Sequence, residues 1–500
     1  MKPVLTVRQV KATEQAAIQN GLSEDILIEN ASAAVTRVVE AVSGNLVQIA
    51  KKTRRCRILI VAGCGNNGAD GLSAARLLHL LNYEVLVVCM AENFNPFVKK
   101  RYDAAKYLQM NVSVYNGVLP DCDILIDAVF GTGLREPLSG IYTELVEKIN
   151  RLPCYKISVD IPSGLNADTG EIMGAAIKAD ETVTFSSAKH GHFLNGAAQY
   201  TGKLTVADIG ILPMIDTNTF FLAQDDRGAL PRKRVSHKYD YGFVKIIAGS
   251  DEMPGAAELA RITAEAALKG GAGLCCLCVP NCLKDIFRQA PGEAMYAFLP
   301  DKDGQILYDE PAFEKVLQKA AVVLIGPGLG RTPETAKIIS YVCRNFSGML
   351  ILDADGLNAL ADFPDCICVK KCRLVLSPHA GEFERLTKHF TFGSDNLIDR
   401  VTEYAAAIDA CIIYKSDLHI IAYKRQAFIN TLLTPALAKG GSGDVLAGLL
   451  AAFFAKTPQD RSVFPAVHAS LAYALAAQNA VLKTGEESLL PSELIPFLKG

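Results

Sequence analysis

Short apolar runs rich in β-branched residues recur along this chain, and helical stretches separate them. The first clear example is residues 57–62, which glycines follow, and residues 72–81 then show the apolar spacing of a helix. A strand, a tight loop and a helix, repeated in this way, build a parallel sheet with right-handed crossovers. The pattern therefore predicts the α/β fold class.

The alternation falls into two blocks, separated at about 213–224 by a segment without clear periodicity. The predicted strands are residues 57–62, 84–89, 122–127 and 155–160 in the first block, and 243–249, 321–325, 349–353, 373–376 and 410–414 in the second. Because a single core stops growing at roughly 250–300 residues, a chain of 500 residues is expected to form two domains. We place them at 1–212, as a Rossmann-like αβα sandwich, and at 225–500.

Composition narrows the classes of protein that this chain can be. Half of its residues are apolar and 21% are charged, which is typical of buried α/β layers. The formal net charge is −2 and the basic residues are dispersed, so no nucleic-acid partner is expected. Residues 1–20 lack the apolar core of a signal peptide, and the longest apolar helix candidate, around 445–455, is too short to span a membrane.

The 14 cysteines favour a reducing compartment. Many of them lie in apolar runs, such as residues 274–279, where cysteine behaves as a small hydrophobic residue. The cysteine clusters lack the histidines or the second pair of thiols that a zinc site needs. We therefore expect a cytoplasmic protein with no membrane partner and no thiolate-bound metal.

The first candidate site begins with the string Gly63-Cys-Gly-Asn-Asn-Gly-Ala-Asp-Gly71, which we predict to be a loop between a strand and a helix. Backbone amides and the N-terminus of the following helix can hold a phosphate or another polar group. Oxygen atoms of Asn66, Asn67 and Asp70 can coordinate a hard cation. The alternative interpretation is a tight strand-to-helix turn without a ligand.

Two further segments repeat one arrangement, an aspartate at the end of a predicted strand followed by a glycine-containing loop. They are residues 127–137, which begin with Asp127, and residues 160–166, which begin with Asp160. Ligands of open parallel sheets bind outside the carboxyl ends of the strands. We therefore expect these segments to converge with residues 63–71 on one crevice, although each aspartate alone can serve as a loop cap.

These strings, in this order, resemble the YjeF N-terminal domain, the NAD(P)H-hydrate epimerase family, over about residues 1–212. The resemblance implies a K⁺ ion held by Asn67, Asp127 and Ser163. One departure is Ala69, where the family usually has glycine, and it matters chiefly if the backbone there needs a positive φ. The residues implied to contact the hydrated nicotinamide nucleotide are Asn66, Asn67, Gly68, Ala69, Asp70, Gly131, Thr132, Gly133, Leu134, Arg135, Glu136, Pro137 and Asp160.

Asp160 is the candidate catalytic residue of this half. Epimerisation at the hydrated carbon needs proton transfer or reversible ring chemistry, and a carboxylate in a closed site is suited to acid–base catalysis. Asp160 ends a predicted strand and stands before Pro162 and Ser163. An Asp160→Asn protein that still epimerised at full rate would exclude this role.

The second candidate site is residues 434–448, in which a glycine cluster opens an apolar helix. The amides from Gly440 to Gly443 can form an anion hole, and the helix N-terminus adds positive potential, which suits a transferring phosphoryl group. Asp444 then lies where a general base takes a proton from an acceptor hydroxyl. The alternative, an aspartate in the favoured first turn of a helix, explains Asp444 but not the glycines.

This string resembles the Gly-x-Gly-Asp signature of the ribokinase-like superfamily, which implies a ribokinase-like α/β domain. Its neighbours, residues 249–257, 326–330, 353–358 and 377–382, follow the order of the ADP/ATP-dependent NAD(P)H-hydrate dehydratase family over about 225–495. The residues implied to contact the hydrated nucleotide are Ala256, Gly330, His379 and Asp444. Those implied to contact the adenine nucleotide are Lys415, Ser416, Asp417, Leu418, His419 and Gly443.

The implied chemistry follows from these parts. A hydroxyl on the hydrated ring is a poor leaving group, so its phosphorylation and the elimination of phosphate would restore the dihydronicotinamide. Mg²⁺ would accompany ADP or ATP, and Glu382 could help to hold it through water. Residues 415–419 and 238–242 depart from the family pattern, so ADP and ATP both stay open as the donor. The hydrates of NADH and NADPH (NADHX and NADPHX) both stay open as substrates, and the resemblance implies a homo-oligomer.

Other interpretations stay open at this point. The C-terminal half can be a kinase of a small molecule such as a vitamin alcohol, since Gly-x-Gly-Asp serves those enzymes too, and the N-terminal half can be a nucleotide-binding regulatory module. His379 can be a loop residue that makes one backbone bond, and residues 387–399 have no functional interpretation. The fusion of the two halves favours a bifunctional repair enzyme that epimerises the R and S hydrates and dehydrates the S form.

Overall fold

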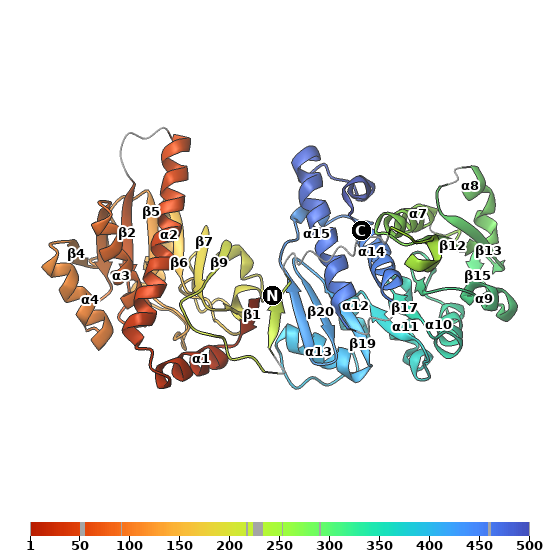
Figure 1. Cartoon of the computed structure of the whole chain (residues 1–500), viewed down its shortest axis with the longest axis horizontal. Coiled ribbons are helices and arrows are strands. Elements are labelled where there is room, and N and C mark those ends of the chain that lie inside the picture. Colours follow the sequence, from red (N-terminus) through yellow and green to blue (C-terminus); the bar gives the residue numbers. More distant parts are fainter. Residues whose placement is uncertain are drawn as a thin grey trace. The chain divides into compact units, whose positions relative to one another are not determined.

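A computed structural model of the chain describes residues 2–50, 56–91, 93–216, 219–223, 234–252, 254–289, 292–458 and 462–499. Its contacts separate two compact units, Lys2–Thr219 and Phe220–Gly500 (Figure 1). Each unit combines a central sheet with helices, which confirms the α/β fold class. Within the described residues, no helix is long and apolar enough to cross a membrane.

The N-terminal unit is built on a parallel sheet with the strand order β4-β3-β2-β5-β6-β7-β9. Its strands are β2 (Arg57–Ala62), β3 (Glu84–Cys89), β4 (Asn111–Val114), β5 (Ile124–Ala128), β6 (Tyr155–Val159), β7 (Glu181–Phe185) and β9 (Lys203–Ala207). Outside this sheet, β1 (Lys2–Leu5) pairs in parallel with β8 (Ala188–Lys189). Its helices are α1 (Val7–Gln19), α2 (Glu24–Ala50), α3 (Asn66–Leu80), α4 (Pro96–Tyr107), α5 (Ile141–Arg151) and α6 (Ala198–Thr201).

Helices cover both faces of this sheet. Val35 of α2, Leu72 of α3 and Val98 of α4 pack in one cluster with the buried strand residues, and Ile149 of α5 packs in a second cluster. The strands are continuous apolar runs because both of their faces are buried. The αβα sandwich is therefore present, and the crossovers leave the carboxyl ends of the strands free to carry a site.

The C-terminal unit has the strand order β13-β12-β11-β16-β17-β18-β19-β20-β21-β10. Its strands are β10 (Phe220–Leu222), β11 (Phe243–Ile247), β12 (Leu274–Pro280), β13 (Met295–Leu299), β16 (Val322–Ile325), β17 (Met349–Leu352), β18 (Arg373–Leu376), β19 (Ala410–Lys415), β20 (His419–Tyr423) and β21 (Gln426–Asn430), beside a small ribbon of β14 (Asp301–Lys302) and β15 (Gln305–Ile306). Strands β13 to β19 are parallel, whereas β19, β20 and β21 form antiparallel hairpins.

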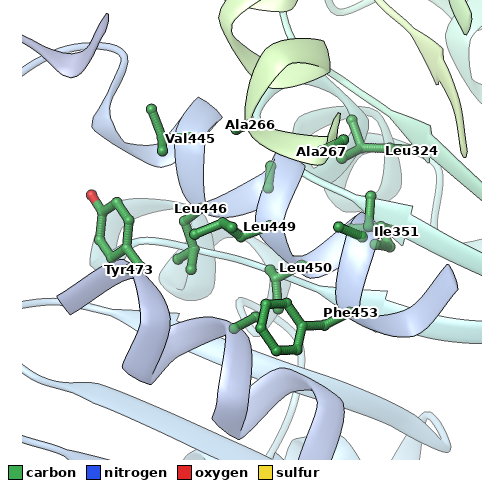
Figure 2. Packing of buried hydrophobic residues seen from close by; sticks show 14 of the residues in the cluster. Ala266, Ala267, Leu324, Ile351, Val445, Leu446, Leu449, Leu450, Phe453 and Tyr473 are labelled. Atoms are coloured by element: carbon green, nitrogen blue, oxygen red, sulfur yellow. The ribbon is translucent and has the colours of Figure 1, made fainter. Parts of the chain in front are cut away.

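The helices of this unit are α7 (Pro254–Lys269), α8 (Lys284–Gln289), α9 (Glu310–Leu317), α10 (Pro333–Asn345), α11 (Asp355–Asp362), α12 (Ala380–Leu386), α13 (Leu397–Ala407), α14 (Ser442–Lys456) and α15 (Phe464–Thr484). Figure 2 shows α14 in the centre of the core, where Leu449 and Leu450 pack with Ala266 of α7 and Ile351 of β17. A helix that is apolar on every side is expected to be buried in this way.

Close backbone packing also fixes the conformation of residues 63–71, the first segment of the candidate site. Helix α3 begins at Asn66, so only residues 63–65 form the loop, and the prediction of a loop over 63–71 with a helix from residue 72 was wrong. A Cβ at Gly68 would lie 2.0 Å from the carbonyl oxygen of Gly63, so the helix turns directly against the strand end. Ala69 is helical and fully buried, so its departure from glycine meets no left-handed backbone.

Residues 387–399 have a packing role. The rings of Phe390 and Tyr404 in α13 pack edge to face, with their centroids 5.3 Å apart. The ring of Phe392 stacks on that of Phe383 in α12, with centroids 6.4 Å apart. Such aromatic pairs stabilise a structure beyond the area that they bury. The segment therefore anchors two helices to each other.

Candidate active sites

A cavity of about 470 Å³ opens at the carboxyl ends of the strands in the N-terminal unit. It gathers the beginning of α3, the turn after β5 and Asp160, which are the three segments that the sequence places in one crevice. It also gathers residues from α1 and β8 that the sequence analysis missed. Its lining is Lys11, Glu14, Gly63, Cys64, Gly65, Asn66, Asn67, Asp70, Val129, Phe130, Gly131, Thr132, Gly133, Leu134, Tyr142, Asp160, Phe185 and Lys189.

Several of the predicted contact residues lie outside this lining. Gly68 and Ala69 are buried in α3, and the lining of the turn after β5 ends at Leu134. Among the described residues, those predicted to touch the nucleotide or the cation but not found in the cavity wall are Gly68, Ala69, Asp127, Arg135, Glu136, Pro137 and Ser163.

Asp127 is a fully buried carboxylate that accepts four hydrogen bonds. Its Oδ2 accepts from the Ser158 hydroxyl at 2.8 Å and from the Ser163 amide at 2.9 Å. Its Oδ1 accepts from the Ser163 hydroxyl at 2.5 Å and from the Val129 amide at 3.3 Å. Burial raises the pKa of Asp127 although these hydrogen bonds oppose the shift. The carboxylate therefore ties the turn after β5 to the turn after β6.

Asp160 forms an ion pair with Lys189, whose side chain is fully buried. The Lys189 ammonium donates to Asp160 Oδ1 at 2.5 Å and to the Thr184 hydroxyl at 2.7 Å. Burial alone would raise the pKa of Asp160, but the charge and the hydrogen bond of Lys189 hold it below its usual value. Asp160 is therefore an ionised carboxylate in the wall of the cavity.

His192 fixes the backbone of Asp160, which has a positive φ of 69°. The Lys189 amide donates to Nδ1 of His192 at 3.0 Å, so the ring proton is on Nε2, which lies 3.0 Å from the Asp160 carbonyl oxygen. Burial and the nearby Lys189 lower the pKa of His192 to about 4. The neutral imidazole thus holds Asp160 in a backbone conformation that few residues other than glycine adopt.

The sequence carried unequal signals for the missed residues. Lys189 stands in Lys-His-Gly-His, an unusual cluster of titratable residues beside a glycine, and could have been singled out for that reason. Glu14 and Lys11 carry no such signal, because isolated charges on an amphipathic helix usually face solvent.

In the C-terminal unit, two strand ends and a helix N-terminus meet around Lys415. Its ammonium donates to Asp353 Oδ1 at 2.7 Å, and Ser377 donates to the same oxygen at 2.9 Å. A methyl group added at Gly443 would lie 3.3 Å from the Lys415 ammonium. This positions a partly buried cation beside the amides that open α14, where both can face an anionic group.

Asp444 lies in the first turn of α14, next to this cation. Burial and the nearby Asp353 carboxylate raise the pKa of Asp444 to about 7, against the opposing charge of Lys415. A carboxylate with its pKa near neutrality is suited to take and return a proton.

His379 is the N-cap of α12, where its side chain accepts hydrogen bonds from two backbone amides. Its Nδ1 accepts from the Gly381 amide at 3.0 Å, and Glu382 Oε2 accepts from the His379 amide at 2.9 Å. Burial and Lys415 lower the pKa of His379. The side chain remains 55% exposed, and its Nε2 lies 3.5 Å from Glu382 Oε1.

The segment 415–419 divides between the site and the core. Ser416 and Asp417 are exposed in the turn after β19, whereas Leu418 is buried. His419 lies in β20 with its Nδ1 2.8 Å from the Ser470 hydroxyl, and burial lowers its pKa to about 3. Its side chain is therefore buried, whereas Ser416 and Asp417 of the preceding turn are exposed.

Two more predicted contacts can be placed. The Gly330 amide donates to Asp355 Oδ2 at 2.9 Å, which ties the loop after β16 to α11. Ala256 lies in α7, but its side chain lies outside the described residues.

Two family models match the chain. The model of NAD(P)H-hydrate dehydratases matches residues 244–499, and the model of the YjeF-related protein N-terminus matches residues 24–191. The first covers the unit that holds Asp353, Lys415 and Asp444. The second covers Asp160 and Lys189 but begins after α1.

Curated relatives match over both units. A bifunctional NAD(P)H-hydrate repair enzyme of Thermofilum pendens is 34% identical over 90% of this chain and 87% of its own length. One of Moorella thermoacetica is 33% identical over 95% of this chain and 91% of its own length. Among solved structures, an ADP/ATP-dependent NAD(P)H-hydrate dehydratase of Bacillus subtilis, co-crystallised with ATP and Mg²⁺, is 27% identical over 56% of this chain and 95% of that chain, with a TM-score of 0.44.

Proposed function

This chain belongs to the family of bifunctional NAD(P)H-hydrate repair enzymes, and from that premise we propose which residues carry its two reactions. It is an isomerase and a lyase that acts on hydrated nicotinamide nucleotides. The observation that carries the proposal is that each unit holds an ion pair between a lysine and a strand-end aspartate, and in the C-terminal unit Asp444, whose pKa is raised to about 7, lies beside that pair.

We assign epimerisation of the R and S hydrates to the cavity of the N-terminal unit. Asp160 is its base, because Lys189 keeps the carboxylate ionised and His192 fixes its backbone. The hydrated ring would lie against the start of α3 and the turn after β5, which supply most of the remaining wall. Arg135, Glu136 and Pro137 follow that turn and would contact more distant parts of the nucleotide.

A K⁺ ion fits beside the same cavity. Asp127 is a buried carboxylate without a salt bridge among the described residues, and Nδ2 of Asn67 is buried without a hydrogen-bond partner there. Because the amide oxygen and nitrogen exchange places when the side chain flips, Asn67 can present an oxygen instead. With the Ser163 hydroxyl, these residues would hold a monovalent cation, which supplies positive charge opposite Asp127.

We assign dehydration of the S hydrate to the C-terminal unit. Asp444 would take the proton of the ring hydroxyl as that oxygen accepts the phosphoryl group, and the amides at Gly441 and Gly443 would face the charge of the transferring group. Lys415 stands beside those amides and adds a fixed positive charge. Elimination of phosphate from the ring then restores the dihydronicotinamide.

ADP or ATP with Mg²⁺ is the proposed phosphoryl donor, placed at Lys415, Ser416, Asp417, Leu418, His419 and Gly443. Mg²⁺ supplies charge neutralisation at the phosphate oxygens. Glu382 is the residue proposed to hold it through water; its Oε2 accepts from the His379 amide, and its Oε1 lies 3.5 Å from Nε2 of His379. Gly330 and His379 would contact the hydrated nucleotide. The protein is proposed to be a homo-oligomer and to act in the cytoplasm.

The rival function, a small-molecule kinase with a regulatory N-terminal module, is not favoured by the relatives, which are named as repair enzymes over both units. A test separates the two. When the protein is incubated with the S hydrate of NADH, Mg²⁺ and either ADP or ATP, the absorbance of the reduced cofactor should return. One free phosphate should be released for each molecule of hydrate consumed. A phosphorylated product that accumulates without recovery of that absorbance would support the kinase instead.

A further inference from the structure

The first residues of the chain are fixed against the epimerase cavity. Strand β1 pairs in parallel with β8, where Leu5 is opposite Lys189. Thr6 then caps α1 in a capping box with Gln9, and Asp168 Oδ1 accepts from the Val7 amide at 2.7 Å. Capping residues and a paired strand set both the start and the direction of a helix. The beginning of α1 is therefore positioned from the same strand that carries Lys189.

The further course of α1 is fixed as well. Val10 and Thr13 are buried, and the Thr13 hydroxyl accepts from the Met214 amide at 3.0 Å. Lys11 and Glu14, one helical turn apart, line the cavity. This helix precedes residues 24–191, the part of the chain that the YjeF family model matches.

Three carboxylates face the cavity, and their surroundings differ. Asp160 forms an ion pair with Lys189, with 2.5 Å between Oδ1 and Nζ. Asp70 is only 9% exposed, deep in α3. Glu14 is partly buried, and neither a hydrogen bond nor an ion pair reaches its carboxylate within the described part of the chain. Of the two carboxylates without such a partner, Glu14 presents more of its surface to a ligand.

We propose that Glu14 is the second acid–base residue of the epimerase, which donates a proton to the ring nitrogen of the hydrate while Asp160 accepts the proton of its hydroxyl. This assignment rests on the proposed role of Asp160. The hydrated carbon bears a hydroxyl and is bonded to the ring nitrogen, so the hydrate is a hemiaminal. Hemiaminals open and close reversibly when one group takes the hydroxyl proton and another protonates nitrogen.

The step balances without a further reactant. Asp160 takes the hydroxyl proton, a carbonyl forms at the hydrated carbon, and the bond from that carbon to the ring nitrogen breaks as Glu14 protonates the nitrogen. Rotation about the neighbouring carbon–carbon bond presents the other face of the aldehyde. The reverse step then closes the ring with the opposite configuration, and each carboxyl group regains its starting state.

The electrostatics of the two groups match these roles. Burial first, and the nearby Asp160 second, raise the pKa of Glu14, against the opposing charges of Lys189 and Lys11 and with a smaller contribution from Glu24. The raised pKa favours a proton on Glu14. Lys189 holds the pKa of Asp160 below its usual value. Two carboxyl groups whose environments move their pKa values apart divide into an acid and a base. The epimerisation rate should therefore fall at low pH as Asp160 is protonated, and at higher pH as Glu14 loses its proton.

The test follows interconversion of the epimers directly. Pure S hydrate is incubated with the full-length protein and K⁺, without ADP or ATP so that it is not dehydrated, and the R form is separated by chromatography. Glu14→Gln keeps the size of the side chain but removes the acidic proton. We expect kcat to fall by about 100-fold or more, with the limb at higher pH abolished and with binding of the hydrate unchanged. Glu40→Gln, an exposed residue of α2 outside the cavity lining, should epimerise at the wild-type rate.

The outcomes are distinct. A wild-type protein that does not accelerate interconversion contradicts the proposed epimerase site itself. A wild-type protein that does so, with a Glu14→Gln variant of equal rate and an unchanged pH profile, overturns the role of Glu14. Loss of activity in Asp70→Asn together with full activity in Glu14→Gln would move the acid to α3 and also overturn it. Thermal unfolding of each variant distinguishes loss of chemistry from loss of fold.

Discussion

Two lysines, Lys189 buried and Lys415 partly buried, distinguish the two sites from ordinary strand ends. Lys189 and Lys415 each bond an aspartate that lies at or beyond the end of a parallel strand. Removing one partner of a buried ion pair leaves an uncompensated charge, which is strongly destabilising. At Asp160, replacing Lys189 by a neutral residue would remove the charge that holds the pKa of the carboxyl group below its usual value.

The pH dependence of dehydration tests Asp444. A general base must be deprotonated, and the pKa of Asp444 is raised to about 7 by burial and by Asp353. The value of kcat/KM for the S hydrate should therefore fall about tenfold for each pH unit below that pKa. It should level off above it. A flat profile through neutral pH, measured at saturating nucleotide and Mg²⁺, would contradict the role of Asp444.

The hydrogen bonds of Asp127, which lies outside the cavity wall, predict that its substitution lowers the free energy of unfolding. Asp127→Asn places an amide NH₂ against hydrogen-bond donors, so we expect the free energy of unfolding to drop by about 2–4 kcal/mol. Urea unfolding measures it. The control is Asp103→Asn on α4, which removes an exposed ion pair with Lys99 and should cost below about 0.5 kcal/mol. Equal losses in the two variants would argue against the buried network.

At the scale of elements, the apolar runs were sufficient to predict the strands. Strands β2, β3, β17 and β18 lie within the predicted ranges, because continuous β-branched runs can be buried only inside a sheet. The start of α3 was predicted wrongly, because two asparagines and several glycines favour a loop. The segment is nevertheless helical, and its close packing against the strand end requires glycine at position 68.

The candidate sites were predicted as far as strand ends and glycine strings reveal them. Asp160 lines the cavity and Asp444 opens α14 as the sequence indicates. The sequence did not reveal that β1 and β8 pair, and this pairing brings Lys189 and α1 to the cavity wall. Pairing between strands far apart in the chain leaves no periodic signal, so residues that depend on it were missed.

The contact of α14 with α7 gives a prediction at this scale. A Cβ at Gly448 would lie 2.2 Å from the carbonyl oxygen of Thr263, so Gly448→Ala must push the two helices apart. We expect a loss of about 1–3 kcal/mol in the free energy of unfolding. In contrast, Gly44→Ala in α2 meets nothing within 4 Å and should stabilise by about 0.5–1 kcal/mol, because alanine favours helix more than glycine. A stabilised Gly448→Ala variant would be inconsistent with this packing.

At the scale of the whole molecule, each site belongs to one unit. The cavity around Asp160 is lined only by residues between Lys11 and Lys189, and the group around Asp444 comes from Phe220–Gly500. The epimer made at one site is the substrate of the other, and it can reach that site by diffusion. Inactivating one site should therefore leave the activity of the other site intact.

The most direct test starts from pure R hydrate, with nucleotide, Mg²⁺ and K⁺, and follows the absorbance of the reduced nicotinamide. The wild-type protein should restore it, whereas Asp160→Asn should do so only at the spontaneous rate of epimerisation and Asp444→Asn should not do so at all. An equal mixture of the two variants should restore the absorbance at a substantial fraction of the wild-type rate. A mixture as slow as Asp160→Asn alone would contradict the division of the two reactions between the two sites.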